Sequence, residues 1–208
     1  MKIARLEAFS DGVLAIAITL LVLDLHLTDG SDKSIGRQLA DQWPSYLAYL
    51  VSFVVIGIMW VNHHALFQHV AHVDRALLFL NLGLLLVIAV LPFPTSVAAE
   101  GLRRGGNDAR VALFTYSLAQ VLIALAFSAI WVYIVRKPGI RQQPMSASDQ
   151  RASIRRFSAG LVAYLLLCGL AFVSPIATLI GHGLVAVYYA FEQLPDAPLA
   201  GPERHQAS

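Results

Sequence analysis

The sequence predicts an all-α integral membrane protein with six transmembrane helices per subunit. Of its 208 residues, 57% are hydrophobic and only 13% are charged, and the mean hydropathy is +0.65. An average soluble domain has about 25% charged residues. The apolar residues also gather in long runs, and residues 76–99 and 111–135 contain no charged side chain. Since about 20 apolar residues cross the ~30 Å hydrocarbon core of a bilayer, both runs are long enough to span it.

Hydropathy and charge together predict the limits of each span. The predicted spans are residues 3–26, 45–67, 76–99, 111–135, 157–173 and 176–191. The last two share one uncharged run that is broken by Ser174-Pro175. Proline lacks a backbone N–H and disfavours helix at the residue before it, so we expect a tight hairpin there. Because both arms are short, a five-span arrangement with one kinked helix over this run is the alternative.

The remaining segments are polar. Residues 137–156 are rich in Gln, Ser and Arg and are expected to form a solvated loop. We expect residues 1–194 to form one membrane domain and residues 195–208 to form a disordered cytoplasmic tail. If the N-terminus is cytoplasmic, ten Lys and Arg lie in cytoplasmic segments and five lie outside. The positive-inside rule therefore predicts two cytoplasmic termini. The ten are Lys2, Arg5, Arg75, Arg136, Lys137, Arg141, Arg151, Arg155, Arg156 and Arg204; the five are Lys33, Arg37, Arg103, Arg104 and Arg110.

Several function classes are disfavoured by what the sequence lacks. A net charge of +2 without a basic stripe predicts no nucleic-acid partner. There is no G-x-S-x-G, no H-E-x-x-H and no carboxylate pair in facing spans, so we expect no enzyme. His69, His72 and Asp74 stand close enough in sequence to bind a metal, although solvated loop residues show the same spacing. We expect no cofactor and no resident metal.

The first span carries an apolar stripe. At 100° per residue, Ile16, Leu20 and Leu23 fall on one face, with Thr19 at its shoulder and Arg5 at its cytoplasmic mouth. Ordinary helix packing produces such a stripe. A hydrophobic constriction built from symmetry copies of this helix, which gates by dewetting, produces it too. Periodicity does not choose between the two.

Asp11 falls about 140° away from that stripe, next to Ser10. A charge inside the membrane costs about 3 kcal/mol on insertion scales, so Asp11 needs a partner. If the first two spans pack antiparallel, Asp11 and Ser10 could accept hydrogen bonds from side chains of the stretch "WVNHHALF". The candidate donors there are Trp60, Asn62, His63 and His64. Two simpler interpretations are an N-cap formed by Ser10 and Asp11 for a helix beginning at Gly12, and interfacial histidines at a helix end.

These residues resemble a known family. "R-x-x-x-F-S-D" followed by "AIAITLLVLDL", "W-x-N-H-H" in the second span and "LNLGLLLVIAVLPFPTS" in the third are similar to the bacterial branch of the transmembrane protein 175 family of endolysosomal-type potassium channels. The resemblance covers residues 3–97. It implies a six-helix subunit that assembles as a homotetramer in the cell (inner) membrane, with the first helix of each subunit around a central pore.

The resemblance also implies roles for individual residues. Ile16, Leu20 and Leu23 match the apolar rings of the pore constriction, and Thr19 with Ile16 matches the selectivity position. The remaining motif positions match a structural polar network: Arg5, Phe9, Ser10, Asp11, Trp60 and His63. The permeant ion would be potassium, with weak to moderate selectivity over sodium, and the family lacks the T-V-G-Y-G filter, as does this sequence.

A proton- or cation-coupled secondary transporter is the alternative function. Asp11 and His63 would form its relay, because ionisable groups inside a membrane mark such paths. Against it, the sequence shows no inverted repeat and no pair of Gly/Pro-broken spans in matching halves.

Overall fold

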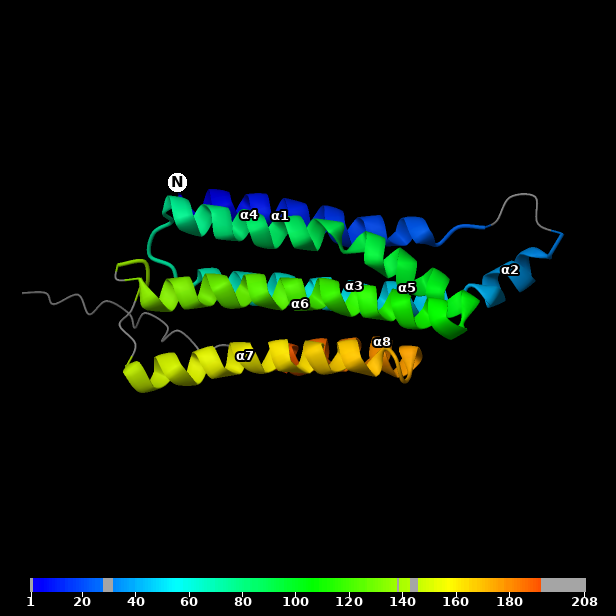
Figure 1. Cartoon of the computed structure of the whole chain (residues 1–208). Helices are drawn as coiled ribbons and strands as arrows, with labels where there is room; N and C mark the ends of the chain where they lie inside the picture. Colours follow the sequence, from blue (N-terminus) through cyan, green and yellow to red (C-terminus); the bar gives the residue numbers. More distant parts are fainter. Residues whose placement is uncertain (1, 28–31, 138, 143–145, 192–208) are drawn as a thin grey trace, which may run out of the picture.

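The computed structural model describes residues 2–27, 32–137, 139–142 and 146–191, and of residues 156–158 and 191 only the backbone (Figure 1). The predicted tail therefore lies outside the described residues. The described chain is helical apart from its loops and one isolated bridge between Val70 and Arg141. Its helices are α1 (Ile3–Leu20), the 3₁₀ turn η1 (Leu21–Asp24), α2 (Ile35–Asp41), α3 (Trp43–Phe67), α4 (Arg75–Val90), α5 (Pro92–Arg104), α6 (Gly106–Arg136), α7 (Ala147–Leu170) and α8 (Pro175–Phe191).

The long helices run side by side in layers. Figure 1 shows α1 and α4 along one side of the bundle, α3 and α6 through its centre, and α7 and α8 on the opposite side. We call the end at which α1 begins the proximal end, and the end at which α1 stops the distal end. Since α1 packs mainly on α3 and α4, no other helix of the described chain covers its outer face.

Within the described residues, five helical segments are long and apolar enough to cross a membrane: Ile3–Asp24, Trp43–Phe67, Arg75–Arg104, Gly106–Arg136 and Ala147–Leu170. The sixth predicted span corresponds to α8, a shorter apolar helix. The all-α membrane fold is thus confirmed. The hairpin is also confirmed, because α7 ends at Leu170 and α8 starts at Pro175, so the alternative with one kinked helix is wrong.

Three segments differ from the prediction. The span expected at residues 76–99 is present as the segment Arg75–Arg104, but it is broken at Leu91 into α4 and α5, because Pro92 cannot donate the backbone hydrogen bond that would continue α4. Residues 147–156 are not a loop but the first turns of α7, whose N-cap Ser146 accepts a hydrogen bond from the Asp149 N–H at 3.2 Å. The short helix α2, capped by Ser34, was not predicted. In each case a helix cap or a proline sets a helix boundary that the average hydropathy does not indicate.

Two groups of buried hydrogen bonds tie the central helices together. Ser52 Oγ lies 2.9 Å from Thr95 Oγ1 and 3.0 Å from the Tyr116 hydroxyl, which joins α3 to α5 and α6. Ser117 Oγ lies 2.8 Å from His182 Nε2 and joins α6 to α8. With no water in the bilayer core, such polar groups have to find partners within the protein.

Asp74 fastens the proximal loop between α3 and α4. Its Oδ1 accepts the Leu77 N–H at 2.9 Å and so caps α4, and its Oδ2 accepts from Lys137 Nζ and from the Tyr133 hydroxyl, each at 2.5 Å. The Lys137 ammonium and these hydrogen bonds hold the pKa of the Asp74 carboxyl well below its usual range. The hydrogen bonds to Asp74 and Tyr133 in turn raise the pKa of the Lys137 ammonium to about 12.

Asp74→Ala is expected to lower the midpoint of thermal unfolding in detergent, because a lost N-cap alone costs about 0.5–2 kcal/mol. Asp74→Asn is the matched control, since it can still cap α4 but loses the ion pair, and its effect should be smaller. As the folded-state pKa is depressed, the stability from this carboxylate is present above about pH 4 and is lost as the pH falls through the folded value. Equal midpoints for wild type and Asp74→Ala at pH 7 would contradict this role.

Candidate functional site: the outer face of α1 and the polar cluster behind it

The two faces of α1 differ sharply in burial. Every third or fourth residue is buried against α3 and α4, namely Leu6, Ser10, Leu14, Ala17 and, in η1, Leu21. The predicted stripe is exposed on the opposite side, with exposed fractions of 61% for Ile16, 41% for Leu20 and 68% for Leu23. In this single chain, therefore, the stripe is not the surface on which α1 packs against its own subunit.

The distal end of this stripe is tightened by a change of helix type. The first span was expected to be α-helical to residue 26, but the α-helix ends at Leu20 and continues as a 3₁₀ turn to Asp24. Because residues three apart eclipse in a 3₁₀ helix, Leu20 and Leu23 project in nearly the same direction.

Thr19 supplies the polar group next to this stripe. Its hydroxyl donates to the Ile16 carbonyl oxygen at 2.9 Å and remains exposed. This bond leaves the lone pairs of Thr19 Oγ1 free to accept a hydrogen bond or to contact a cation.

A buried polar cluster, which we define as Ser10, His63 and Asn81, lies behind α1. The Asn81 amide donates to Ser10 Oγ at 3.0 Å, and Ser10 Oγ donates to the Leu6 carbonyl oxygen at 2.9 Å. Asn81 Oδ1 lies 2.8 Å from His63 Nε2. Since Oδ1 can only accept, Nε2 is the nitrogen of His63 that carries the hydrogen. The cluster links α1, α3 and α4 through residues that are almost fully buried.

Asp11 has a separate partner at the edge of this cluster. The Trp60 indole N–H donates to Asp11 Oδ1 at 2.9 Å, in a partly open position on α3. Ser10 and Asp11 lie in mid-helix, since α1 begins at Ile3, so the interpretation that they cap a helix beginning at Gly12 is wrong. No hydrogen bond joins Asp11 to His63 among the described residues, and the direct relay of the transporter alternative is not formed.

The other predicted network residues lie apart from the cluster. His64 Nδ1 is 3.4 Å from a carboxylate oxygen of Glu7, and its Nε2 is 3.1 Å from the Gln68 amide nitrogen. Asn62 is half-buried and makes no side-chain hydrogen bond within the described chain. Arg5 and Phe9 are exposed on the same side as the stripe, and the Arg5 guanidinium has no partner in the part of the chain that the structure describes.

His69 and Asp74, considered above for a metal, are used differently. His69 Nδ1 lies 2.9 Å from the Ala65 carbonyl oxygen, and Asp74 binds Lys137. Among the described residues, no three or more His, Cys, Asp or Glu side chains are grouped so as to hold a metal ion.

Asn81, at the centre of the cluster, was missed by the sequence analysis. It is a single amide in an otherwise apolar span, within "LNLG". Because a polar side chain in a transmembrane helix is costly unless it is paired across helices, such a residue marks a helix contact. That signal was available, but the identity of its partners required the tertiary structure.

The exposed face of α1 is chemically unlike that of its neighbour α4. After Arg75, its first residue, α4 exposes only apolar residues and one glycine: Ala76, Phe79, Leu82, Gly83, Leu86, Ala89 and Val90. In α1, Arg5 and Thr19 are exposed beside the apolar stripe, and the exposed Asp11 lies on a different side, where it meets Trp60 of α3. Ionisable groups inside a membrane are rare on lipid-facing surfaces and usually face protein or a water-filled space. The face of α1 therefore fits an aqueous or protein-lined environment better than lipid.

Comparisons with known proteins agree on one family. The sequence model of the family described as "Endosomal/lysosomal potassium channel TMEM175" matches residues 5–92. A protein of Streptomyces collinus that is named a potassium channel is 52% identical over 192 residues, which cover 92% of this chain and 93% of that protein. The crystal structure of a lysosomal potassium-selective channel TMEM175 homolog from Chamaesiphon minutus superposes with a TM-score of 0.81 at 35% identity, and the match covers 93% of this chain and 98% of that one.

The fold and these likenesses define an all-α, multi-pass membrane protein of the ion-channel class, and not an enzyme. The resemblance found in the first three spans is thereby confirmed. The chain belongs to the TMEM175 family, and the two relatives just described are bacterial.

Asp11→Ala is expected to reduce the yield of assembled protein or to change gating, and to leave ion selectivity unaltered, because it removes a contact between α1 and α3 on the side away from the stripe. Trp60→Phe is the matched variant, since it deletes the N–H donor and keeps an aromatic ring. Both substitutions should lower the free energy of unfolding by about 1–2 kcal/mol, and the thermal midpoint should fall with it. A change in reversal potential with a normal yield of assembled protein would contradict this assignment.

Proposed function

We propose that this chain is one subunit of a homotetrameric, potassium-permeable channel in which α1 of each copy lines a central pore. The observation that carries the proposal is the outer face of α1, which exposes Ile16, Leu20 and Leu23 while the opposite face is fixed to α3 and α4. The potassium-channel names of its relatives support the identity of the ion.

In this proposal the narrowest part of the pore is a ring of four Ile16 side chains. A ring of isoleucines offers no oxygen ligands, so an ion has to cross it with a reduced or rearranged hydration shell. Potassium holds its water less tightly than sodium, and an apolar constriction therefore penalises sodium more. Rings of Leu20 and Leu23 extend the dry segment toward the distal end and favour dewetting when the pore is narrow.

Thr19 is the selectivity partner of Ile16 in this scheme. Its hydroxyl is held toward the backbone of Ile16, and its free lone pairs could receive a water or the ion beside the constriction. Weak to moderate selectivity follows, because neither residue forms the multiple carbonyl sites of a T-V-G-Y-G filter, which is absent from the sequence.

The polar residues behind α1 form the structural network of this proposal. Ser10, His63 and Asn81 fix the position of α1 inside the subunit, while Asp11 with Trp60 and Glu7 with His64 hold its proximal half to α3. Arg5 and Phe9, which make no such contact within one chain, are placed to meet a neighbouring copy of α1. No resident metal or cofactor is part of the mechanism; potassium is the permeant ion.

We further propose that the protein resides in the cell membrane with both termini in the cytoplasm, from the excess of Lys and Arg in the segments joined to the proximal end. The proximal end would then be cytoplasmic and the distal end would face outside.

The test is single-channel recording of the purified protein in planar bilayers under a potassium/sodium gradient. Unitary currents with a potassium-biased reversal potential would support the proposal. Saturable flux into vesicles without unitary currents, lost in Asp11→Ala, would instead favour the proton- or cation-coupled transporter.

A further inference from the structure

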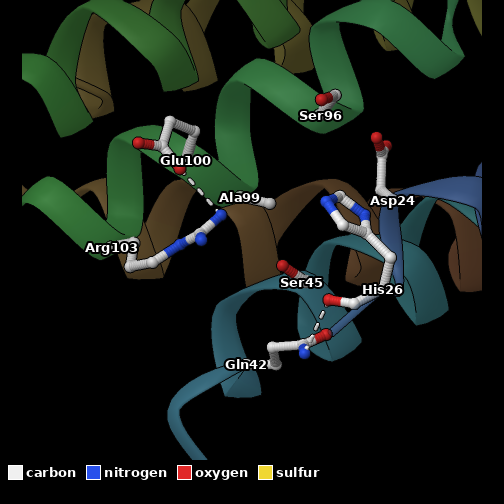
Figure 2. Close-up of a pocket in the computed structure, with 8 residues that line it drawn as sticks. All are labelled: Asp24, His26, Gln42, Ser45, Ser96, Ala99, Glu100 and Arg103. Atoms are coloured by element: carbon white, nitrogen blue, oxygen red, sulfur yellow. Dashed lines mark hydrogen bonds and ion pairs between the residues drawn. The ribbon is translucent and has the colours of Figure 1, made fainter. Parts of the chain in front are cut away.

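The distal end of the bundle contains a polar cavity of about 270 Å³ (Figure 2). Figure 2 shows that its walls come from three parts of the chain: the end of the first span, the start of α3 and the stretch of α5 from Ser96 to Arg103. Its lining residues are Asp24, His26, Gln42, Ser45, Ser96, Ala99, Glu100 and Arg103. A single buried water occupies only a small part of such a volume.

The polar groups of this cavity fall into two sets. Glu100 is already neutralised, since its Oε2 lies 2.7 Å from Arg103 Nη2 and its Oε1 lies 2.7 Å from Arg104 Nε. The His26 carbonyl oxygen accepts the Gln42 amide at 2.9 Å, which joins the chain after η1 to the start of α3. Arg104 Nη1 also lies 3.7 Å from Asp108 Oδ2, so the two guanidinium groups face two carboxylates and the charges of the wall cancel. The His26 imidazole lines the cavity without a hydrogen bond to the described residues.

The second set has no partner. Neither the Asp24 carboxylate nor the hydroxyls of Ser45 and Ser96 make a side-chain hydrogen bond or ion pair within the described residues. Ser45 is only 4% exposed, so it can meet little besides the contents of the cavity. A buried polar group without a partner in the protein indicates an occupant that satisfies it.

We propose that this cavity binds a partly hydrated monovalent cation, potassium in the working protein, through Asp24, Ser45 and Ser96. Carboxylate and hydroxyl oxygens are ligands for hard cations, and one free carboxylate favours a single positive charge. A dedicated calcium site needs six to eight oxygens, which these side chains do not supply without many waters.

The site has a structural consequence for α1. Asp24 is the last residue of the 3₁₀ turn that carries Leu23, while Ser45 and Ser96 belong to α3 and α5. A cation held by all three would fasten the distal end of α1 to the rest of the subunit. This inference rests on the proposed function only for the position of the site, which would lie beside the outer end of the pore and away from the pore axis. Binding of the ion does not require that the protein conducts.

The test uses Rb⁺ as a probe for potassium. Crystals of the full-length protein grown in rubidium chloride should show an anomalous peak between Asp24, Ser45 and Ser96 in each subunit. The peak should be absent in Asp24→Asn and weakened in Ser45→Ala, which is a milder change should Asp24→Asn assemble poorly. Asp32→Asn is the matched control, because this exposed carboxylate lies between η1 and α2 and is not part of the cavity lining. Its peak should equal that of the wild type.

A solution measurement gives a second readout. The thermal midpoint of the wild type should rise as potassium replaces N-methyl-D-glucamine at constant ionic strength, and the half-saturating concentration should increase several-fold in Asp24→Asn. No peak in the cavity, or a peak and a titration unaffected by Asp24→Asn, would overturn the site even if the channel conducts. Rubidium in the cavity of a protein without unitary currents would overturn the proposed pore and leave the site standing.

Discussion

Replacing Ile16 by asparagine is expected to raise the unitary conductance several-fold and to move the potassium/sodium permeability ratio toward unity. Ile16 is the most exposed of the large hydrophobic residues of α1, and in the proposed tetramer four copies form the constriction. Four amides there would supply oxygen and nitrogen ligands in place of methyl groups, so an ion would lose less hydration energy on crossing. Each ~1.4 kcal/mol removed from the barrier multiplies the crossing rate by about ten. The measurement is single-channel conductance and reversal potential under a bi-ionic gradient.

Ile16→Leu is the control at the same position, because it keeps an apolar ring of similar volume. Its permeability ratio should stay close to that of the wild type, although its conductance can shift with ring diameter. Normal discrimination in Ile16→Asn, with currents recorded, would remove Ile16 from the constriction. The exposed stripe would then be a packing surface between subunits or toward lipid.

Replacing Asn81 by leucine is expected to have the largest effect on assembly. Asn81 is fully buried and is the only described residue that bonds both Ser10 and His63. Leucine fills a similar volume but leaves the Nε2–H of His63 without an acceptor, and Ser10 Oγ keeps only its bond to the Leu6 carbonyl oxygen. An unsatisfied buried group costs about 1–3 kcal/mol, and hydrogen bonds between membrane helices average somewhat less. We expect the free energy of unfolding to fall by about 1–3 kcal/mol. The fall should appear as a lower thermal midpoint of the tetramer, followed by size-exclusion chromatography after heating.

A double-mutant cycle separates this contact from general disturbance of α4. Ser10→Ala and Asn81→Leu should be clearly less destabilising together than the sum of the single changes, because they remove the same hydrogen bond. Leu82→Ala is the control, since Leu82 is an exposed neighbour on the same helix. Additive effects of the first pair would show that the Ser10–Asn81 bond contributes no coupling energy. Channels of Asn81→Leu that do assemble should keep wild-type selectivity.

Much of the fold could be predicted because it follows from the bilayer. Long uncharged runs have to be helices, since every backbone group needs an internal partner there, and Ser174-Pro175 has to interrupt the last run. Local signals were weaker. Ser146 starts α7 inside a segment that composition assigned to a loop, and Pro92 divides a span that hydropathy assigned to one helix. Average hydropathy does not register a cap or a missing N–H, so the loop expected at residues 147–156 was wrong and the break at Pro92 was not predicted.

The candidate site divides in the same way. The stripe of Ile16, Leu20 and Leu23 is a property of helical spacing and was available from the sequence, as was the need of Asp11 for a partner. That His63 would bond Asn81 and not Asp11, and that Trp60 would take the carboxylate, depends on how far apart three helices stand. The spacing of residues along one helix does not give the distances between neighbouring helices.

By itself the sequence determined a membrane-embedded helical protein whose first span has one apolar stripe and a carboxylate on a different face, because hydropathy and the helical period act along the chain. Only the tertiary structure decided which face of α1 is covered, since burial is a relation between helices. It shows Ser10 turned into the bundle and Ile16 turned out of it. It also brings Asp24, Ser45 and Ser96 around one cavity, although these residues stand far apart in sequence, because the end of η1 and the start of α3 meet α5 there.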